Sequence, residues 1–139
     1  MWTRSYSRIV EGINASQVWK VWTDVNHWHT WQADIEYAKL DGEFKKGSVF
    51  LFKPKGGPKI RIELTKVESN SIFVDLTKFL LARMYGSHAL IDHGNELEIK
   101  TTIRIERPLS FLWRKLVAEN VARGMKEQTE RLIEKVKNA

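Results

Sequence analysis

The sequence has 139 residues, of which 42% are hydrophobic and 29% are charged, as expected for one ordinary globular domain over residues 1–139. Basic side chains outnumber acidic ones by 23 to 17, but they are spread along the chain, so the net charge of +6 does not by itself indicate a nucleic-acid partner. No cysteine is present, which excludes disulfides, thiolate catalysis and cysteine-ligated zinc or iron–sulfur centres.

A strand followed by two short helices is predicted at the start of the chain. Residues 3–11 alternate as a strand. Asn14 or Ser16 then caps a helix of about eight residues, because short polar side chains accept hydrogen bonds from the first free backbone N–H groups. The apolar residues of this helix lie at helical spacing: Val18, Trp19 and Trp22. Asp24 begins a second short helix, which carries three large rings: His27, Trp28 and Trp31.

Six more strands are predicted from the alternation of apolar and polar residues. They cover residues 35–40, 49–52, 59–67, 72–79, 83–92 and 96–105. Turn signals such as Asp41-Gly42 separate them. The alternation is cleanest in the last strand, where Leu97, Ile99 and Ile103 share one face. One apolar face and one polar face are typical of an antiparallel sheet that is covered on a single side.

The tail of the chain, residues 108–138, is predicted to form one long amphipathic helix. Pro108 suits the first turn because its missing N–H is not needed there. The apolar residues recur mostly at steps of three and four and are Leu109, Leu112, Leu116, Val117, Val121, Met125, Leu132 and Val136. At about 1.5 Å per residue the helix is roughly 45 Å long. Gly124 costs about 1 kcal/mol relative to alanine inside a helix, so we expect a kink there or a close approach to the structure beneath.

Together these elements indicate an α+β fold. The predicted order is one strand, two short helices, six strands and one long helix. In an α+β fold the helices lie on one side of an antiparallel sheet. A seven-stranded sheet twists enough to curl around a single helix. The pattern alone does not decide whether side chains fill the space between sheet and helix or leave a cavity.

Five parts of the sequence carry a family resemblance: residues 18–31, 40–47 and 73–75, His88, and residues 107–109. In this order and spacing they resemble the START-like or SRPBCC superfamily, in its polyketide cyclase/dehydrase and lipid-transport branch. The resemblance implies a helix-grip fold, in which a seven-stranded curved antiparallel sheet wraps around the long C-terminal helix and leaves a cavity for apolar ligands. Members include carriers of lipids and hormones, cyclases and dehydratases. The branch commonly has glycine at the position of Arg107.

We expect the chain to bind a small apolar or amphipathic ligand, such as a lipid, a polyketide-like molecule or an aromatic compound, between the sheet and the helix. Strand parity, the apolar helix face and the resemblance select the ligand-binding residues: Trp28, Trp31, Tyr37, Phe50, Phe52, Leu64, Phe79, Met84, His88, Val121 and Met125. Four polar groups are candidates to converge on the ligand: Tyr37, Asp75, His88 and Arg104. Asp75 and Arg104 are equally compatible with outward surface positions.

Few residues indicate catalysis or metal binding. The sequence has no nucleophile elbow, phosphate loop or dinucleotide fingerprint. His88 shares the parity of Met84 and is a candidate general base or polar anchor, or a histidine that only bonds to a neighbour. We therefore expect a binding protein, and the alternative is a cyclase or dehydratase that uses the same cavity. His27 and His29 point to different sides of a helix, so no metal site is expected, and no cofactor is predicted.

The densest basic segment, residues 53–61, is typical of a solvated hairpin, and the alternative is a contact with an anionic surface such as a membrane. Nucleic acid is not an expected partner. The sequence has no apolar run of about 18 residues and no signal-peptide core near its start, so we expect a cytoplasmic protein. Monomer and homodimer both remain open.

Overall fold

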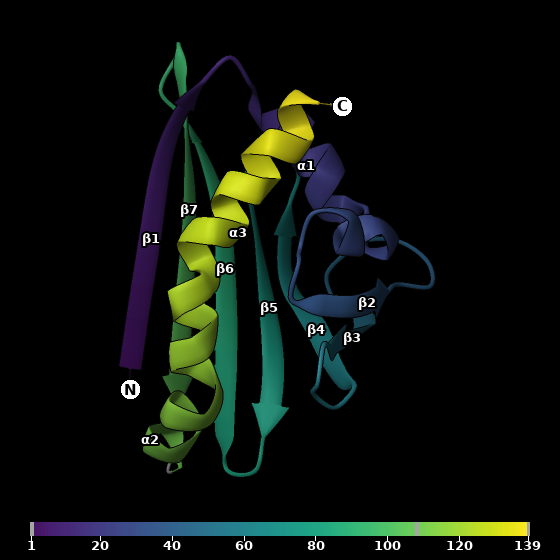
Figure 1. The fold of residues 1–139 in the computed structure, drawn as a ribbon, viewed down its shortest axis with the longest axis vertical. Helices are drawn as coiled ribbons and strands as arrows, with labels where there is room; N and C mark the ends of the chain where they lie inside the picture. The colour runs from purple at the N-terminus through teal and green to yellow at the C-terminus, as the bar shows by residue number, and fades with distance from the viewer. Residues whose placement is uncertain (1, 108, 139) are drawn as a thin grey trace.

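Seven antiparallel strands form one sheet in a computed structural model that describes residues 2–107 and 109–138. Their order is β1-β7-β6-β5-β4-β3-β2, so β2 to β7 follow one another across the sheet and β1 returns beside β7. The strands are β1 (Trp2–Glu11), β2 (Ile35–Lys39), β3 (Val49–Pro54), β4 (Ile60–Glu68), β5 (Ile72–Phe79), β6 (Ala82–Asp92) and β7 (Glu96–Glu106). The predicted α+β fold, a curved sheet around a tail helix, is confirmed (Figure 1).

The alternation that predicts the strands also determines which face of the sheet is buried. In β7 the side chains of Leu97, Ile99, Ile103 and Ile105 are buried, whereas Lys100 is exposed. Successive side chains of a strand point to opposite faces, so one face of the sheet carries the core and the other meets solvent. The tail helix crosses the buried face, over β6 and β7 (Figure 1).

The first short helix has the expected cap. Asn14 precedes α1 (Ala15–Thr23), and its side-chain oxygen accepts the backbone N–H of Gln17 at 3.0 Å, while the backbone N–H of Asn14 donates to the Gln17 side chain at 2.9 Å. This reciprocal pair is a capping box, which satisfies two backbone N–H groups at the helix start. Val18 and Trp22 are the buried residues of α1.

The second short helix differs from the prediction in two respects. It is a 3-10 helix, η1 (Val25–Thr30), and Trp31 lies just past its end. The Asp24 side chain does not cap it, because the carboxylate bonds instead to Nδ1 of His27 at 2.8 Å. The indole N–H of Trp28 donates to the carbonyl oxygen of Trp22 at 3.0 Å, which fixes η1 against α1.

The predicted long tail helix is confirmed and runs without a break from Ser110 to Lys137, but it is not uniform. It consists of α2 (Ser110–Trp113), a π-helical turn η2 (Arg114–Ala118) and α3 (Glu119–Lys137). Pro108, on which the predicted start depends, lies outside the described residues. A Cβ built on Gly124 would have no heavy atom within 4 Å, so the expected close approach is absent. The helix is regular at Gly124, and its irregularity is the π turn before α3.

The core has two clusters. The larger one joins α1, η1 and the sheet to the second half of α3, where Leu132, Ile133 and Val136 are buried. The smaller one packs Ala118 and Met125 of the tail against β6 and β7. The predicted apolar face of the tail is therefore only partly covered, and its exposed members are Leu112, Leu116 and Val121. None of the helices in residues 2–107 and 109–138 is both long and apolar enough to cross a membrane.

Candidate functional site

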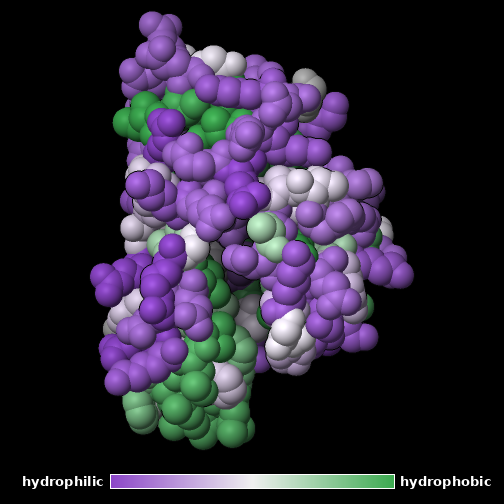
Figure 2. Space-filling model, viewed as in Figure 1, coloured by the Kyte–Doolittle hydropathy of each residue, from purple (hydrophilic) through white to green (hydrophobic). Residues whose placement is uncertain are grey.

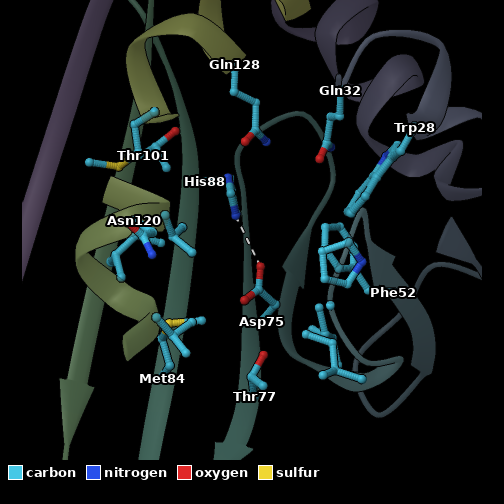
Figure 3. Close-up of a pocket in the computed structure, with 18 of the residues that line it drawn as sticks. Trp28, Gln32, Phe52, Asp75, Thr77, Met84, His88, Thr101, Asn120 and Gln128 are labelled. Carbon is cyan, nitrogen blue, oxygen red and sulfur yellow. Dashed lines mark hydrogen bonds and ion pairs between the residues drawn. The ribbon is translucent and has the colours of Figure 1, made fainter. Parts of the chain in front are cut away.

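A pocket of about 560 Å³ lies between the sheet and the tail helix, and residues of both core clusters line it (Figure 3). Nine of the eleven residues that the sequence selects are in its lining: Trp28, Trp31, Phe50, Phe52, Phe79, Met84, His88, Val121 and Met125. They come from η1, from the segment that follows it and from strands β3, β5, β6 and the tail, so elements distant in sequence build one apolar wall. Contact of these residues with a ligand stays a prediction.

Tyr37 and Leu64 do not line the pocket, so this part of the sequence-based selection is wrong. Leu64 is fully buried in the larger core cluster. Beside it the segment before β3 extends the pairing with β4, because Gly47 N–H donates to the Leu64 carbonyl at 2.7 Å and Leu64 N–H donates to the Ser48 carbonyl at 2.8 Å. In β2 the pairing register shifts between Ile35 and Tyr37, and this irregularity resets the alternation on which the choice of Tyr37 depends.

A histidine and a carboxylate meet on the pocket wall. Nε2 of His88 on β6 lies 3.1 Å from Oδ2 of Asp75 on the neighbouring strand β5, and each side chain is 17% exposed. The His88 ring stacks on Phe73, with ring centres 4.4 Å apart and planes at 16°, and meets Trp22 edge-on at 5.9 Å. Asp75 is opposite Gly86 in the sheet. A Cβ on Gly86 would lie 2.7 Å from the Asp75 carboxylate, so any larger residue there would displace the carboxylate from this position.

The bond to Asp75 determines what the other nitrogen of His88 does. A carboxylate accepts hydrogen bonds, so Nε2 carries the proton and Nδ1 of a neutral ring is left with a free lone pair. In Figure 3 this second nitrogen points away from Asp75, on the side of Gln128. Among the described residues Nδ1 has no hydrogen-bond partner. The pair therefore offers one oriented acceptor in an otherwise apolar wall, which is an arrangement that a ligand hydroxyl or a transferable proton requires.

Further polar side chains of the pocket are not in the sequence-based selection. They are Gln32, Thr77, Thr101, Asn120, Gln128 and Thr129. Thr129 already donates its hydroxyl to the Met125 carbonyl at 2.8 Å. Thr77 shares the parity of Asp75 and Phe79 on β5, and parity alone therefore places it on the inner face. The sequence-based selection omits Thr77 because a polar residue in a strand is ordinarily assigned to the solvent face.

Of the four candidate polar groups, Asp75 and His88 lie together in the pocket lining, whereas Tyr37 and Arg104 lie outside it. Arg104 lies on the other face of the sheet, with its guanidinium 4.5 Å from the centre of the Tyr85 ring. Tyr37 lies outside the pocket lining. The histidines of η1 are also outside the pocket, and in the described part of the chain no three His, Asp or Glu side chains are grouped closely enough to hold a metal ion.

The basic hairpin contributes one edge of the pocket. Pro54, Lys55, Gly56 and Gly57, which connect β3 to β4, are in the lining. Lys53 is paired with Glu36 at 2.8 Å. Leu116 and Val121 of the tail helix are exposed members of the lining as well, so exposed residues of both the hairpin and the tail border the pocket.

Comparison with known proteins finds similarity in structure alone. No protein-family model matches the sequence, and no curated protein matches it. A START superfamily protein from Mycobacterium smegmatis superimposes with a TM-score of 0.72 at 12% identity, over 98% of this chain and 97% of that chain. Norcoclaurine synthase from Thalictrum flavum gives 0.72 at 12%, over 99% and 88%. The di-domain ARO/CYC protein BexL gives 0.76 at 10%, over 100% of this chain and 48% of that chain.

These similarities identify the fold. Each solved structure has the same arrangement over nearly the whole of this chain, although the sequences are only 10% to 12% identical. The chain has the START-like (SRPBCC) helix-grip fold, as the sequence resemblance implies. A shared fold does not by itself specify a ligand or a reaction.

Proposed function

We propose that the protein binds a small amphipathic molecule, such as a lipid, a polyketide-like molecule or an aromatic compound, in the pocket between sheet and helix. The observation that carries this proposal is a largely apolar pocket of about 560 Å³ with one oriented polar pair, His88 and Asp75, in its wall. Pockets of this size suit small organic ligands, and a few placed polar groups orient them. The solved norcoclaurine synthase contains dopamine and hydroxybenzaldehyde, which supports an aromatic ligand by analogy.

The pocket's chemistry restricts the ligand further. Its apolar body would lie against Phe50, Phe52 and Met84, where burial contributes about 25 cal/mol per Å² of apolar surface. Its polar group would be a hydroxyl, because Nδ1 of His88 accepts a hydrogen bond and does not donate one in the neutral ring. Naphthol is therefore a suitable probe, and naphthalene is the matched probe without a hydroxyl.

Filling the pocket tests this proposal. Val121 lines the pocket and is 39% exposed, so Val121→Trp adds a large ring at the opening without forcing it into the packed core. We expect titration calorimetry to show that naphthol binds the native protein and that Val121→Trp weakens binding about tenfold or more. The control is Ile9→Trp, which adds the same ring on exposed β1. Absence of naphthol binding, or an equal loss in both variants, would contradict the proposal.

A second candidate function is a dehydratase or cyclase in the same pocket, and the His88–Asp75 pair is the observation that favours it. Nδ1 of His88 would remove a proton from the carbon beside a substrate carbonyl, and Asp75 would stabilise the imidazolium that forms. The same proton would then pass to a β-hydroxyl, which leaves as water while the carbon–carbon double bond forms. The similarity to an ARO/CYC protein supports this reaction class by analogy.

Separate variants distinguish binding from catalysis. For an enzyme that dehydrates a β-hydroxyketone, we expect His88→Gln to lower kcat by about a hundredfold or more, the usual contribution of a positioned base. Affinity for naphthalene should stay unchanged, since the apolar wall is intact. If water loss from such substrates is no faster with the native protein than with His88→Gln, the catalytic candidate is wrong and the binding proposal stands.

A further inference from the structure

An exposed apolar surface covers the end of the molecule where the tail helix begins. We call it the apolar tip, and it consists of Leu80 and Leu81 between β5 and β6 with Phe111, Leu112 and Leu116 of the tail. Leu80 is 71% exposed, Phe111 61% and Leu81 60%. Figure 2 shows this hydrophobic surface at the lower end of the molecule, beside a cleft. Single exposed apolar residues are ordinary, but a contiguous group of this kind marks an interaction site.

Hydrogen bonds and a ring stack hold the two parts of the apolar tip together. Leu109 N–H donates to the Leu81 carbonyl at 3.1 Å, and the indole N–H of Trp113 donates to the Leu80 carbonyl at 2.9 Å. The rings of Phe79 and Trp113 stack with centres 4.6 Å apart. These contacts tie the β5–β6 hairpin to the helix start, so the leucines are held outward together.

Backbone strain is concentrated beside the same surface. Leu81 has φ +53° and Arg107 has φ +90°, in the region that favours glycine or asparagine. Among the residues that the structure describes, the third non-glycine residue with positive φ is Asn70, which tolerates this conformation. The backbone of Leu81 is therefore strained, and its exposed side chain buries little apolar surface that would offset this strain. Strain of this kind persists where a residue serves a function.

Basic residues lie on the elements next to the apolar tip and on the β3–β4 hairpin. Those at the end of the molecule near the apolar tip are Lys78, Arg83, Arg107 and Lys115, and those of the β3–β4 hairpin are Lys55, Lys59 and Arg61. Within residues 2–107 and 109–138 none of the seven forms an ion pair. Both groups lie at the same end of the molecule (Figure 1). This distribution complements a broad anionic surface with an apolar interior.

The apolar tip is continuous with the pocket. Leu116 belongs to both, since it lines the pocket and is 57% exposed. Phe79, which precedes the leucines of the hairpin, also lines the pocket. An apolar molecule would therefore pass from a surface that covers the apolar tip into the pocket without crossing open water.

We propose that the apolar tip docks on an anionic lipid bilayer, with its leucines and Phe111 at the boundary between headgroups and acyl chains and the surrounding cations on the lipid phosphates. Apolar burial combined with attraction to anionic lipid is the usual basis of such peripheral binding. The proposal of docking depends only on the apolar tip and the basic residues near it. The transfer of a ligand between bilayer and pocket rests in addition on the proposed binding function.

Vesicle sedimentation tests docking. We expect the native protein to sediment with vesicles of equal parts phosphatidylcholine and phosphatidylglycerol, to sediment less as salt is raised, and to bind pure phosphatidylcholine more weakly. Leu81→Asn removes an inserted side chain and relieves the strained φ. We expect it to weaken vesicle binding about tenfold while raising the melting temperature. Arg107→Gly should also raise the melting temperature and weaken binding to the anionic vesicles only.

Two controls keep docking separate from ligand binding. Ile9→Asn removes another exposed apolar side chain, 49% exposed, at the other end of the sheet and should leave vesicle binding unchanged. Val121→Trp should still dock, and Leu81→Asn should still bind naphthol in solution, so failure of either proposal is visible alone. Docking is overturned if the native protein ignores anionic vesicles or if Leu81→Asn binds them normally. It is also overturned if sedimentation velocity without lipid shows a dimer that Leu81→Asn dissociates.

Discussion

Gly86 determines where the Asp75 carboxylate lies. A Cβ at this position would be 2.7 Å and 2.9 Å from the two carboxylate oxygens, so Gly86→Ala must turn Asp75 away from His88. We expect the free energy of unfolding to fall by about 1–3 kcal/mol, the usual cost of overpacking. Naphthol binding should weaken as well, because His88 loses the group that orients it. Denaturant unfolding and calorimetry measure the two effects.

A double variant identifies the cause of that loss. In an Asp75→Ala background the clash is absent, so Gly86→Ala should then have little effect on stability. A strongly non-additive pair is the signature of groups in contact. An equal loss in both backgrounds would mean that the carboxylate is not what Gly86 accommodates.

Glu98 makes folding stability depend on pH. The Ser7 hydroxyl, followed by the His93 ring, donates hydrogen bonds that lower the pKa of the Glu98 carboxyl below its ordinary 4.5. A carboxyl with a lowered folded-state pKa adds stability above its ordinary pKa and loses it as the pH falls through the folded-state pKa. The stability difference between the native protein and Glu98→Gln should therefore shrink as the pH drops below 4.5. Ser7→Ala should reduce that difference, and a difference independent of pH would contradict the assignment.

At the scale of elements, the tail helix joins two differently packed halves. Its second half is anchored in the core through Leu132, Ile133 and Val136, whereas its start is held by backbone and indole hydrogen bonds to the β5–β6 hairpin. The π turn lies between them. One extra residue in a helical turn rotates everything before it relative to everything after, so the same apolar stripe faces the core at one end and the pocket opening at the other.

Gly124 lies in the regular part of this tail and has free space around it. Gly124→Ala should therefore raise the free energy of unfolding by about 0.5–1 kcal/mol, since alanine restricts the unfolded chain and favours the helix. Gly94→Ala is the matched control, because Gly94 also has free space but has φ +90°, and it should be destabilising. A loss of stability in Gly124→Ala, measured by thermal unfolding, would show that the helix is distorted there.

Periodicity predicts which elements exist and misses where they become irregular. The strands β5 and β7 match their predicted ranges closely because their alternation is long and regular. The periodicity does not predict the π turn, because a helical pattern with a period of 3.6 residues continues across one inserted residue without a visible break. The register shift near Tyr37 escapes because it depends on how β2 pairs with β3. Both are tertiary effects that no single segment encodes.

The sequence predicts the residues of the pocket wall best where that wall is apolar. Phe50, Phe52 and Met84 are large apolar residues on inward positions, and parity selects them. Thr77 and Thr101 share the inward parity, but polar side chains carry no burial signal. Leu64 has the right parity, but its side chain is fully buried in the larger core cluster, so parity alone does not separate the pocket wall from the core.

At the scale of the whole molecule, the pocket divides the core into two clusters that a ligand would join. A ligand that binds only the folded protein raises its stability by about 2.7 kcal/mol at a hundredfold excess over Kd. For a chain of this size that corresponds to a rise in melting temperature of roughly 5–10 °C. We expect saturating naphthol to produce such a rise in the native protein and little change in Val121→Trp, as measured by calorimetry. An equal rise in both would place binding outside the pocket.

The position of β1 has a consequence for the protein while it is being made. β1 pairs with β7 from Trp2 opposite Ile105 to Glu11 opposite Glu96. On the ribosome β1 therefore emerges before its partner β7 and stays unpaired until β7 has been synthesised, and such distant pairing slows folding. An unpaired strand is a template for aggregation, which charged and polar side chains oppose. The exposed polar residues of β1, Thr3, Arg4, Ser5 and Ser7, thus protect the nascent chain during the interval before the sheet closes.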